Sequence, residues 1–266
     1  MRILLILISI ILFGNNLVAQ TDSLKVIDSV SVNSPIAQKN WLQSRYVHES
    51  IVPVSLALGS VAIISIPGLK ESLQKPFSWN SAHNINLSLD KLPHDFLLED
   101  EMRYVPAVAA YAISLCGVKS QHKFIDKTVI LAVSYIASDF VVNTTKNLTK
   151  SLRPGRDATS TDSYSLPSQH TAMAFVAATF LDHELGYISP WISVGGYAVA
   201  TWVGIARVAN NDHWTSDVLM GAAVGILMTN ATYWAYDGVM KLFQKKLTIS
   251  PLIDSQQTGL YFCYKF

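Results

Sequence analysis

The sequence predicts an all-α protein, a six-helix and membrane-embedded bundle with a short C-terminal β-hairpin-like tail. Half of its 266 residues are hydrophobic and only 15% are charged, whereas soluble proteins carry about a quarter charged residues. The apolar residues gather in segments that are too long for strands. Gly and Ala recur closely in "MGAAVGILM", a pattern that lets helices pack tightly in a bilayer.

Six apolar segments account for the predicted helices, at roughly 51–69, 103–118, 128–144, 170–186, 190–206 and 217–236. A helix that crosses a bilayer needs about 20 apolar residues. The uncharged runs 51–69, 186–206 and 218–236 reach that length, but 104–118 and 128–138 are shorter. A compact periplasmic domain with apolar core helices therefore remains the alternative to a membrane bundle.

The flanking regions differ from these segments in composition. Residues 1–20 hold one Arg, an apolar run and small residues, which indicates a signal peptide or an uncleaved N-terminal anchor. Residues 21–50 are interpreted as a polar linker or interfacial segment, residues 51–240 as the helical domain with its motif core at 104–236, and residues 241–266 as the tail. In the tail, "DSQQTG" separates two β-rich runs, which predicts a hairpin.

Charge and cysteine content exclude several classes of function. The net charge of +1 provides no basic field for a nucleic-acid partner. The two cysteines have no metal-binding spacing, so we expect no metal site. The polar stretch 70–102, which holds His94, Asp95, Glu99 and Asp100, is interpreted as a solvated loop in preference to a cap over a site.

Three polar islands interrupt the apolar segments, at 146–154, 165–171 and 206–217. Ionisable groups beside apolar helices are costly unless they serve a site or face water. In an up-and-down bundle the end of the third helix, the start of the fourth and the end of the fifth lie together. The islands are therefore predicted to meet at one end of the bundle.

The islands contain the groups that an anion site requires. Lys146, Arg153 and Arg207 can bind a dianionic phosphate, because cationic side chains pair with its oxygens and Arg does so bidentately. The hydroxyl of Ser168 and the amides at the start of the fourth helix can add neutral donors.

The same islands contain acid–base and nucleophilic groups. Of the two histidines, His170 and His213, one can attack phosphorus and the other can protonate the leaving oxygen. Asp217 follows His213 by four residues, so the two share a face if that segment is helical. A carboxylate there can hold one imidazole nitrogen and leave the other free to attack.

At these residues the chain resembles the type 2 phosphatidic acid phosphatase (PAP2) and vanadium haloperoxidase superfamily, in its membrane lipid-phosphate phosphatase branch. Lys146 is followed by six residues and then Arg153-Pro154, "PSQH" spans 167–170, and Arg207 is followed at the family's spacing by His213 and Asp217. Two positions depart from the pattern, because Gln169 replaces a glycine and Ala206 replaces a serine.

The resemblance implies a role for each matched residue. It implies that His213 forms a phosphohistidine, that Asp217 orients it, and that His170 protonates the leaving group. It also implies phosphate binding by the remaining matched positions, which are Lys146, Arg153, Ser168, Gln169 and Arg207. It implies no metal or other cofactor for phosphatase chemistry.

The expected function is hydrolysis of a phosphate monoester or diphosphate of a membrane lipid, such as phosphatidate, phosphatidylglycerophosphate, polyprenyl diphosphate or lipid A. The expected partners are this substrate and the membrane lipids. The alternatives are a soluble periplasmic acid phosphatase, a vanadate-dependent haloperoxidase, which would need vanadate, and a non-catalytic phospholipid-binding protein.

Lysines suggest the orientation in the membrane. Lys119, Lys123 and Lys127 lie between the second and third segments, and Lys241, Lys245 and Lys246 follow the sixth. Positive loops favour the cytoplasm, so the islands are expected to face the periplasm from an inner membrane. A cleaved signal peptide followed by three spans predicts the opposite side, and the two readings conflict.

Overall fold

The computed structural model describes residues 45–74, 99–154, 164–254 and 257–264. The chain divides into residues 1–40 and 41–266, and all described residues lie in the second unit. The predicted signal or anchor, most of the 21–50 segment, and His94 and Asp95 of the polar stretch fall outside the described residues. The predicted domain boundaries therefore stay predictions.

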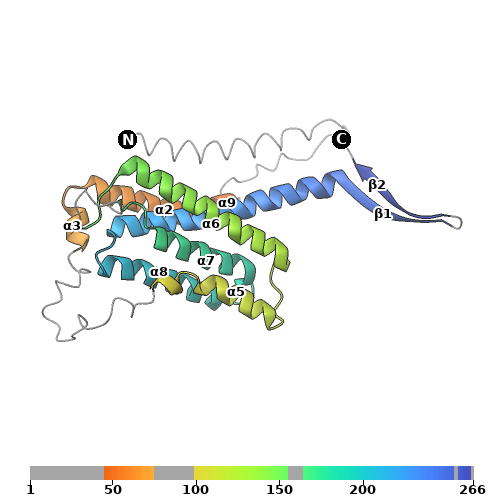
Figure 1. Cartoon of the computed structure of the whole chain (residues 1–266), viewed down its shortest axis with the longest axis horizontal. Helices are drawn as coiled ribbons and strands as arrows, with labels where there is room; N and C mark the ends of the chain where they lie inside the picture. Colours follow the sequence, from red (N-terminus) through yellow and green to blue (C-terminus); the bar gives the residue numbers. More distant parts are fainter. Residues whose placement is uncertain (1–44, 75–98, 155–163, 255–256, 265–266) are drawn as a thin grey trace, which may run out of the picture. The chain divides into compact units, whose positions relative to one another are not determined.

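Six long helices form the described part of the bundle, and two short ones join them (Figure 1). The long helices are α2 (Arg45–Ser65), α5 (Val105–Leu115), α6 (Phe124–Thr149), α7 (Gln169–Leu185), α8 (Pro190–Ala209) and α9 (Thr215–Lys246). The short helices are α3 (Leu69–Gln74) and α4 (Glu99–Met102). This confirms the predicted all-α class and the six apolar segments as helices.

A β-hairpin follows α9, as the tail sequence predicts. Strand β1 (Leu247–Asp254) pairs antiparallel with β2 (Gln257–Tyr264), and the register runs from Leu247 opposite Tyr264 to Asp254 opposite Gln257. The helix continues to Lys246, so the tail begins with a helical turn and the strands start later than position 241.

Local sequence explains where several helices begin and end. Ser189 caps α8 by accepting a hydrogen bond from the Trp191 amide at 3.3 Å, and Pro190 occupies the first turn. Helix α6 ends at Thr149 and is followed by its C-cap residue Lys150, which adopts a left-handed conformation with φ of 46°. Helix α2 includes Arg45 to Ser50, so the end of the predicted linker is helical.

Helix α7 is the core of the bundle. It contacts α5, α6, α8 and α9, and most of its side chains are buried. Gly221 and Gly225 of α9 face its backbone so closely that an added Cβ would lie 2.5 Å from the Ser168 carbonyl oxygen and 2.4 Å from that of Ala172, respectively. Small residues thus allow two helices to approach, as in membrane bundles.

The outer surface of the bundle is apolar. On α6, Ile125, Ile136 and Phe140 are at least 70% exposed, and Trp191 of α8 is 77% exposed. Large exposed apolar surfaces indicate contact with lipid or another partner. Within the described residues, three helices are long and apolar enough to cross a membrane, namely α2, α8 and α9 as far as Lys241. Together these features indicate a membrane protein.

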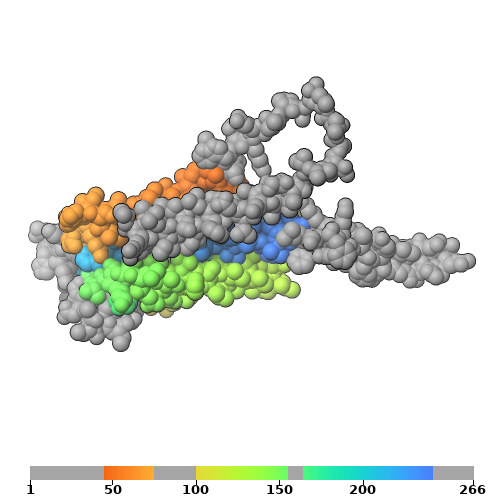
Figure 2. All heavy atoms as spheres, turned by 90° about the horizontal axis from the view of Figure 1, so that it is seen from above, coloured from red at the N-terminus to blue at the C-terminus, as the bar shows by residue number. Residues whose placement is uncertain are grey.

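Helix α9 lies between α2 and α6, with which it packs (Figure 2).

One of the lysines used above to predict the membrane orientation is not a solvent-exposed loop residue. Lys127 is 2% exposed, and its ammonium donates to Ser114 Oγ at 2.8 Å and to Ser120 Oγ at 3.3 Å. The positive character of this loop therefore rests on Lys119 and Lys123.

Candidate phosphate site

The connection between α8 and α9 carries the third motif. Arg207 lies in the last turn of α8, and its carbonyl accepts the amides of Asp212 at 3.1 Å and His213 at 3.2 Å. Asn211 adopts a left-handed conformation with φ of 56°, which folds the chain back on itself. The side-chain amide of Gln74 in α3 donates a hydrogen bond to the Val208 carbonyl at 3.1 Å and stabilises this turn.

His213 and Asp217 meet, but not on one face of a helix. Helix α9 begins at Thr215, so His213 lies before the helix. The prediction that His213 and Asp217 share one face required both residues to be helical, and His213 is not. His213 Nδ1 lies 3.6 Å from Asp217 Oδ2, and both side chains are at most 1% exposed. Asp217 also accepts the Trp214 amide at 2.9 Å, which caps the first turn of α9.

Ser165 completes this group, a role that sequence reasoning missed. Its hydroxyl donates to Asp217 Oδ2, and its oxygen lies 3.2 Å from His213 Nδ1. The imidazole is therefore held on its Nδ1 side, which leaves Nε2 as the nucleophilic nitrogen. The polar residue beside "PSQH" was the one signal of Ser165 in the sequence.

Burial controls the charge of His213. Removal from water lowers the pKa of His213 below its usual value, and Arg153 and Arg207 lower it further. Hydrogen bonding and attraction to Asp217 oppose this shift but are outweighed. The imidazole therefore stays neutral near neutral pH, which is the form that can attack phosphorus.

Arg153 and Arg207 come together around one carboxylate. Asp212 Oδ2 lies 3.2 Å from Arg207, and its Oδ1 lies 3.8 Å from Arg153. Both guanidinium groups are mostly buried, with 12% of the Arg153 side chain and 9% of the Arg207 side chain exposed. The cations of the first and third motifs therefore lie together in the structure. No role was assigned to Asp212 from the sequence.

The first motif reaches the site from α6. Lys146 lies in the last helical turn, and Lys150 ends the helix. The Trp214 indole donates to the Leu152 carbonyl at 2.8 Å, which ties the Lys146–Arg153 segment to the third motif. Lys70 of α3 lies 4.4 Å from the centre of the Trp214 ring, a further cation that sequence reasoning did not place here.

The second motif forms the N-terminus of α7. Ser168 caps the helix by accepting from the Thr171 amide at 3.4 Å and from the Thr171 hydroxyl at 2.9 Å. Its own hydroxyl proton remains available as a donor. Gln169 donates through its side chain to Asp139 of α6 at 2.5 Å, so its backbone N–H is the group that can serve an anion at this helix end.

His170 lies in the first turn of α7 and contacts a residue from a distant segment. Its Nε2 is 2.6 Å from Asp100 Oδ1 of α4. The interpretation of residues 70–102 as a solvated loop is wrong at Asp100, because this carboxylate reaches a motif histidine. The hydrogen bond from His170 is the main reason that the pKa of Asp100 lies below its usual value.

The described residues contain no group of three or more His, Cys, Asp or Glu side chains placed to hold a metal ion. The absence of a cofactor therefore stays a prediction. Cationic and imidazole groups such as those present can bind and transfer a phosphoryl group.

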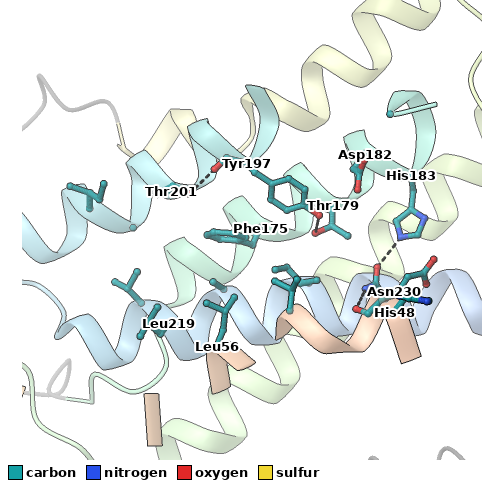
Figure 3. A pocket seen from close by; sticks show the side chains of 18 of the residues that line it. His48, Leu56, Phe175, Thr179, Asp182, His183, Tyr197, Thr201, Leu219 and Asn230 are labelled. Carbon is teal, nitrogen blue, oxygen red and sulfur yellow. Dashed lines mark hydrogen bonds between the residues drawn. The ribbon is translucent and has the colours of Figure 1, made fainter. Parts of the chain in front are cut away.

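An apolar pocket of about 930 Å³ adjoins this end of the bundle and runs between α2, α7, α8 and α9. Leu56, Phe175 and Leu219 line one part of it, and His183 and Asn230 lie at the other end, joined at 2.8 Å (Figure 3). The pocket reaches Val208 and Thr215, the neighbours of the third motif, although the motif side chains themselves do not line it.

Comparison with known proteins places these motifs in a family. The model of the PAP2 superfamily matches residues 127–241. A lipid A 1-phosphatase of Porphyromonas gingivalis is 41% identical over 172 residues, which cover 61% of this chain and 38% of the relative. The chain thus spans about two fifths of that relative's length.

Two solved structures are similar in part. A transmembrane PAP2-type phosphatidylglycerolphosphate phosphatase from Bacillus subtilis is 20% identical with a TM-score of 0.47, over 71% of this chain and 97% of that one. LpxE of Aquifex aeolicus is 22% identical with a TM-score of 0.40, over 52% of this chain and 84% of that one. The three ordered motifs all lie within residues 127–241, the part of the chain that is similar to the PAP2 superfamily.

Proposed function

We propose that this protein is a metal-independent phosphatase that hydrolyses a phosphate monoester or diphosphate of a membrane lipid through a phosphohistidine. The observation that carries the proposal is the buried group formed by His213, Asp217 and Ser165 beside Arg153 and Arg207. It combines a neutral, oriented imidazole with two cations, which are the parts that phosphoryl transfer needs.

In the first step His213 Nε2 forms a bond to phosphorus, and the bond from phosphorus to the leaving oxygen breaks. Arg153, Arg207 and Lys146 bind the phosphoryl oxygens, with the Ser168 hydroxyl and the Gln169 amide as neutral donors. The leaving oxygen keeps the bonding electrons and takes a proton from His170. Asp217 and Ser165 stabilise the charge that develops on the His213 ring.

In the second step a water molecule gives a proton to His170 and attacks phosphorus. The bond between phosphorus and Nε2 breaks, and inorganic phosphate leaves. His213 returns to its neutral form and His170 to its protonated form, so the cycle closes without a metal or redox cofactor.

The apolar pocket next to the third motif supports a lipid as the group that carries the phosphate. Its lining matches acyl chains better than it matches a sugar or a nucleoside. The similarity to a lipid A 1-phosphatase makes a lipid A phosphate the first substrate to test, followed by phosphatidylglycerophosphate, phosphatidate and polyprenyl diphosphate.

The decisive experiment measures phosphate release from each lipid by the full chain in mixed micelles, with His213→Gln as the matched variant. We expect release by the native chain and a loss of at least about a thousandfold in the variant, because the nucleophile is absent. A ³²P-labelled phosphoenzyme should accumulate in His170→Ala and be absent in His213→Gln. Native-level release by His213→Gln would disprove the proposed role.

We further propose that the site faces the periplasm from an inner membrane, from the lysines at the opposite end of the bundle. Cysteine substitutions at Asn211, beside the site, and Gln121, in the α5–α6 connection, can be compared in a background in which both native cysteines, Cys116 and Cys263, are replaced by Ser. An impermeant thiol reagent added to intact cells should label position 211 and leave 121 unlabelled. The reverse pattern would establish the opposite orientation.

A further inference from the structure

The short helix α4 brings a second carboxylate to the site. It contacts both α7 and α8, and from it Asp100 Oδ1 reaches His170 Nε2 at 2.6 Å. The His170 side chain is 23% exposed and that of Asp100 is 65% exposed. A histidine of the second motif is thus paired with an acid some 70 residues earlier in the chain.

The charges around His170 indicate what the contact with Asp100 does. Burial, Arg207 from α8 and Arg103, which follows α4, together lower the pKa of His170 to about 4 and disfavour its protonated form. Asp100 is the anion that acts on the ring against them. On the side of α6, Asp139 is engaged by Gln169. An imidazolium beside two guanidinium groups needs such a counter-charge.

The arrangement parallels the one at His213. There a carboxylate and a hydroxyl hold Nδ1 and leave Nε2 free. At His170 the Asp100 carboxylate contacts Nε2, so Nδ1 is the nitrogen that can face a substrate. In each case one ring nitrogen is fixed by an acceptor and the other remains for chemistry, which sets the tautomer and the ring orientation.

We propose that Asp100 is the positioning residue of the acid histidine. Its carboxylate at Nε2 fixes the ring, favours the protonated form against the surrounding positive charge, and directs Nδ1 toward the oxygen that leaves phosphorus. This inference rests on the proposed phosphatase function and deepens it. It also gives the segment before α5 a part in the chemistry, although that segment lies outside residues 127–241 matched by the family model.

The chemistry of the first step provides a specific test. When the bond from phosphorus to the leaving oxygen breaks, an alkanol must receive the proton from His170 Nδ1, because its alkoxide is a poor leaving group. A nitrophenolate leaves readily without a proton. Loss of a residue that positions the acid should therefore slow the first kind of ester and spare the second.

The experiment uses Asp100→Asn in the full chain, with two phosphate monoesters that carry the same alkyl chain. One ester releases an alkanol and the other a nitrophenol. Glu101→Gln is the matched control, because Glu101 is an exposed carboxylate on the same short helix. We expect Asp100→Asn to lower the rate of phosphoenzyme formation, measured by rapid quenching, about tenfold with the alkyl ester and less than about twofold with the nitrophenyl ester.

The exposure of Asp100 sets this magnitude. Solvent screens a carboxylate that is 65% exposed, so the expected loss is smaller than removal of the acid itself would cause. Unchanged phosphoenzyme formation from the nitrophenyl ester also shows that the variant is folded and that His213 still attacks phosphorus.

Several results would overturn the inference while leaving the phosphatase proposal intact. They are an equal loss for both esters, an unchanged rate for the alkyl ester, a rate that rises, or the same selective loss in Glu101→Gln. A rise would mean that Asp100 excludes substrate from the site. If the native chain hydrolyses neither ester nor any lipid phosphate, the proposed function fails and this inference fails with it.

Discussion

The backbone N–H of Ser168 donates a hydrogen bond to the carbonyl oxygen of Asp217, at 3.0 Å. The bond joins the N-terminus of α7 to the first turn of α9, so the second and third motifs are fixed to each other through the main chain. Gly221 lies one turn further along α9, where an added Cβ would be 2.5 Å from the Ser168 carbonyl oxygen. The spacing of His170 and His213, which we propose as the catalytic histidines, therefore depends on this close helix contact.

Gly221→Ala is expected to destabilise the protein by about 1–3 kcal/mol, because the new methyl group must push the helices apart. Gly195→Ala in α8 is the control, since no described residue lies within 4 Å of its added Cβ. That change should stabilise the helix slightly, by up to about 1 kcal/mol. Thermal unfolding in detergent measures both, and equal midpoints for the two variants would contradict the expectation.

Ser165→Ala is expected to lower the rate of phosphoenzyme formation about tenfold, because the hydroxyl links His213 to Asp217 and limits rotation of the ring. Ser134→Ala is the control, since Ser134 is buried but bonds only to the Ile130 carbonyl of its own helix. Rapid quenching with ³²P-labelled substrate gives the rate. A rate equal to that of the control would remove Ser165 from the mechanism.

The nucleophile is expected to remain active below pH 6.5. Burial lowers the pKa of His213, so the neutral and nucleophilic form persists as the pH falls through 6.5, the usual value for histidine. Titration by NMR of ¹⁵N-labelled histidines, with the His213 signal assigned by its loss in His213→Gln, measures this directly. A titration midpoint at or above 6.5 would show that Asp217 outweighs burial.

The same shift has a consequence for stability. The unfolded chain binds a proton at His213 near pH 6.5 and the folded chain binds it only at lower pH. This group therefore contributes stability that is present above pH 6.5 and is lost as the pH falls toward the folded pKa. The unfolding midpoint of the native chain should decrease over this acidic range more steeply than that of His213→Gln, and parallel curves would contradict the assignment.

Asp212→Asn is expected to strengthen binding of inorganic phosphate and vanadate about three- to tenfold. The carboxylate lies near both Arg153 and Arg207, and removing its charge increases the positive potential that attracts an anion. Inhibition constants measure the effect, with Glu101→Gln as a charge-matched control. Weaker inhibition would show instead that Asp212 is needed to hold the two arginines in place.

Leu56→Trp is expected to raise KM for a long-chain lipid phosphate about tenfold and to leave a short-chain ester unaffected. Leu56 lines the pocket (Figure 3), and the larger ring fills space that an acyl chain would occupy. Leu58→Trp is the control on the same helix, because Leu58 is 55% exposed and does not line the pocket. Equal effects on both chain lengths would exclude the pocket as the acyl site.

Much of the fold could be predicted because long apolar runs separated by polar islands allow few alternatives. The tail was also predictable, since β-rich runs around a polar turn favour a hairpin. Helix boundaries were less accurate. Helix α6 extends from Phe124 to Thr149, well beyond the uncharged segment, because a helix can continue through Lys and Asn that face water or a site.

The candidate site was predictable where its residues are close in sequence. Arg207, His213 and Asp217 lie in the α8–α9 connection and the helical turns beside it, so a short sequence motif is enough to identify them. Contacts across the fold were not visible. Asp100 reaches His170 and Gln74 reaches the α8–α9 turn, and neither pair has a local pattern.

The sequence by itself determined the helical bundle and the groups available for the proposed chemistry, because hydrophobic runs specify helices and the islands supply cations, two histidines and a carboxylate. Tertiary structure alone decided which nitrogen of each histidine is held and by what. Ser165 lies 3.2 Å from His213 and Asp100 lies 2.6 Å from His170. Hydrogen bonds depend on ångström-scale distance and direction, and helix packing sets these by bringing together residues far apart in the chain.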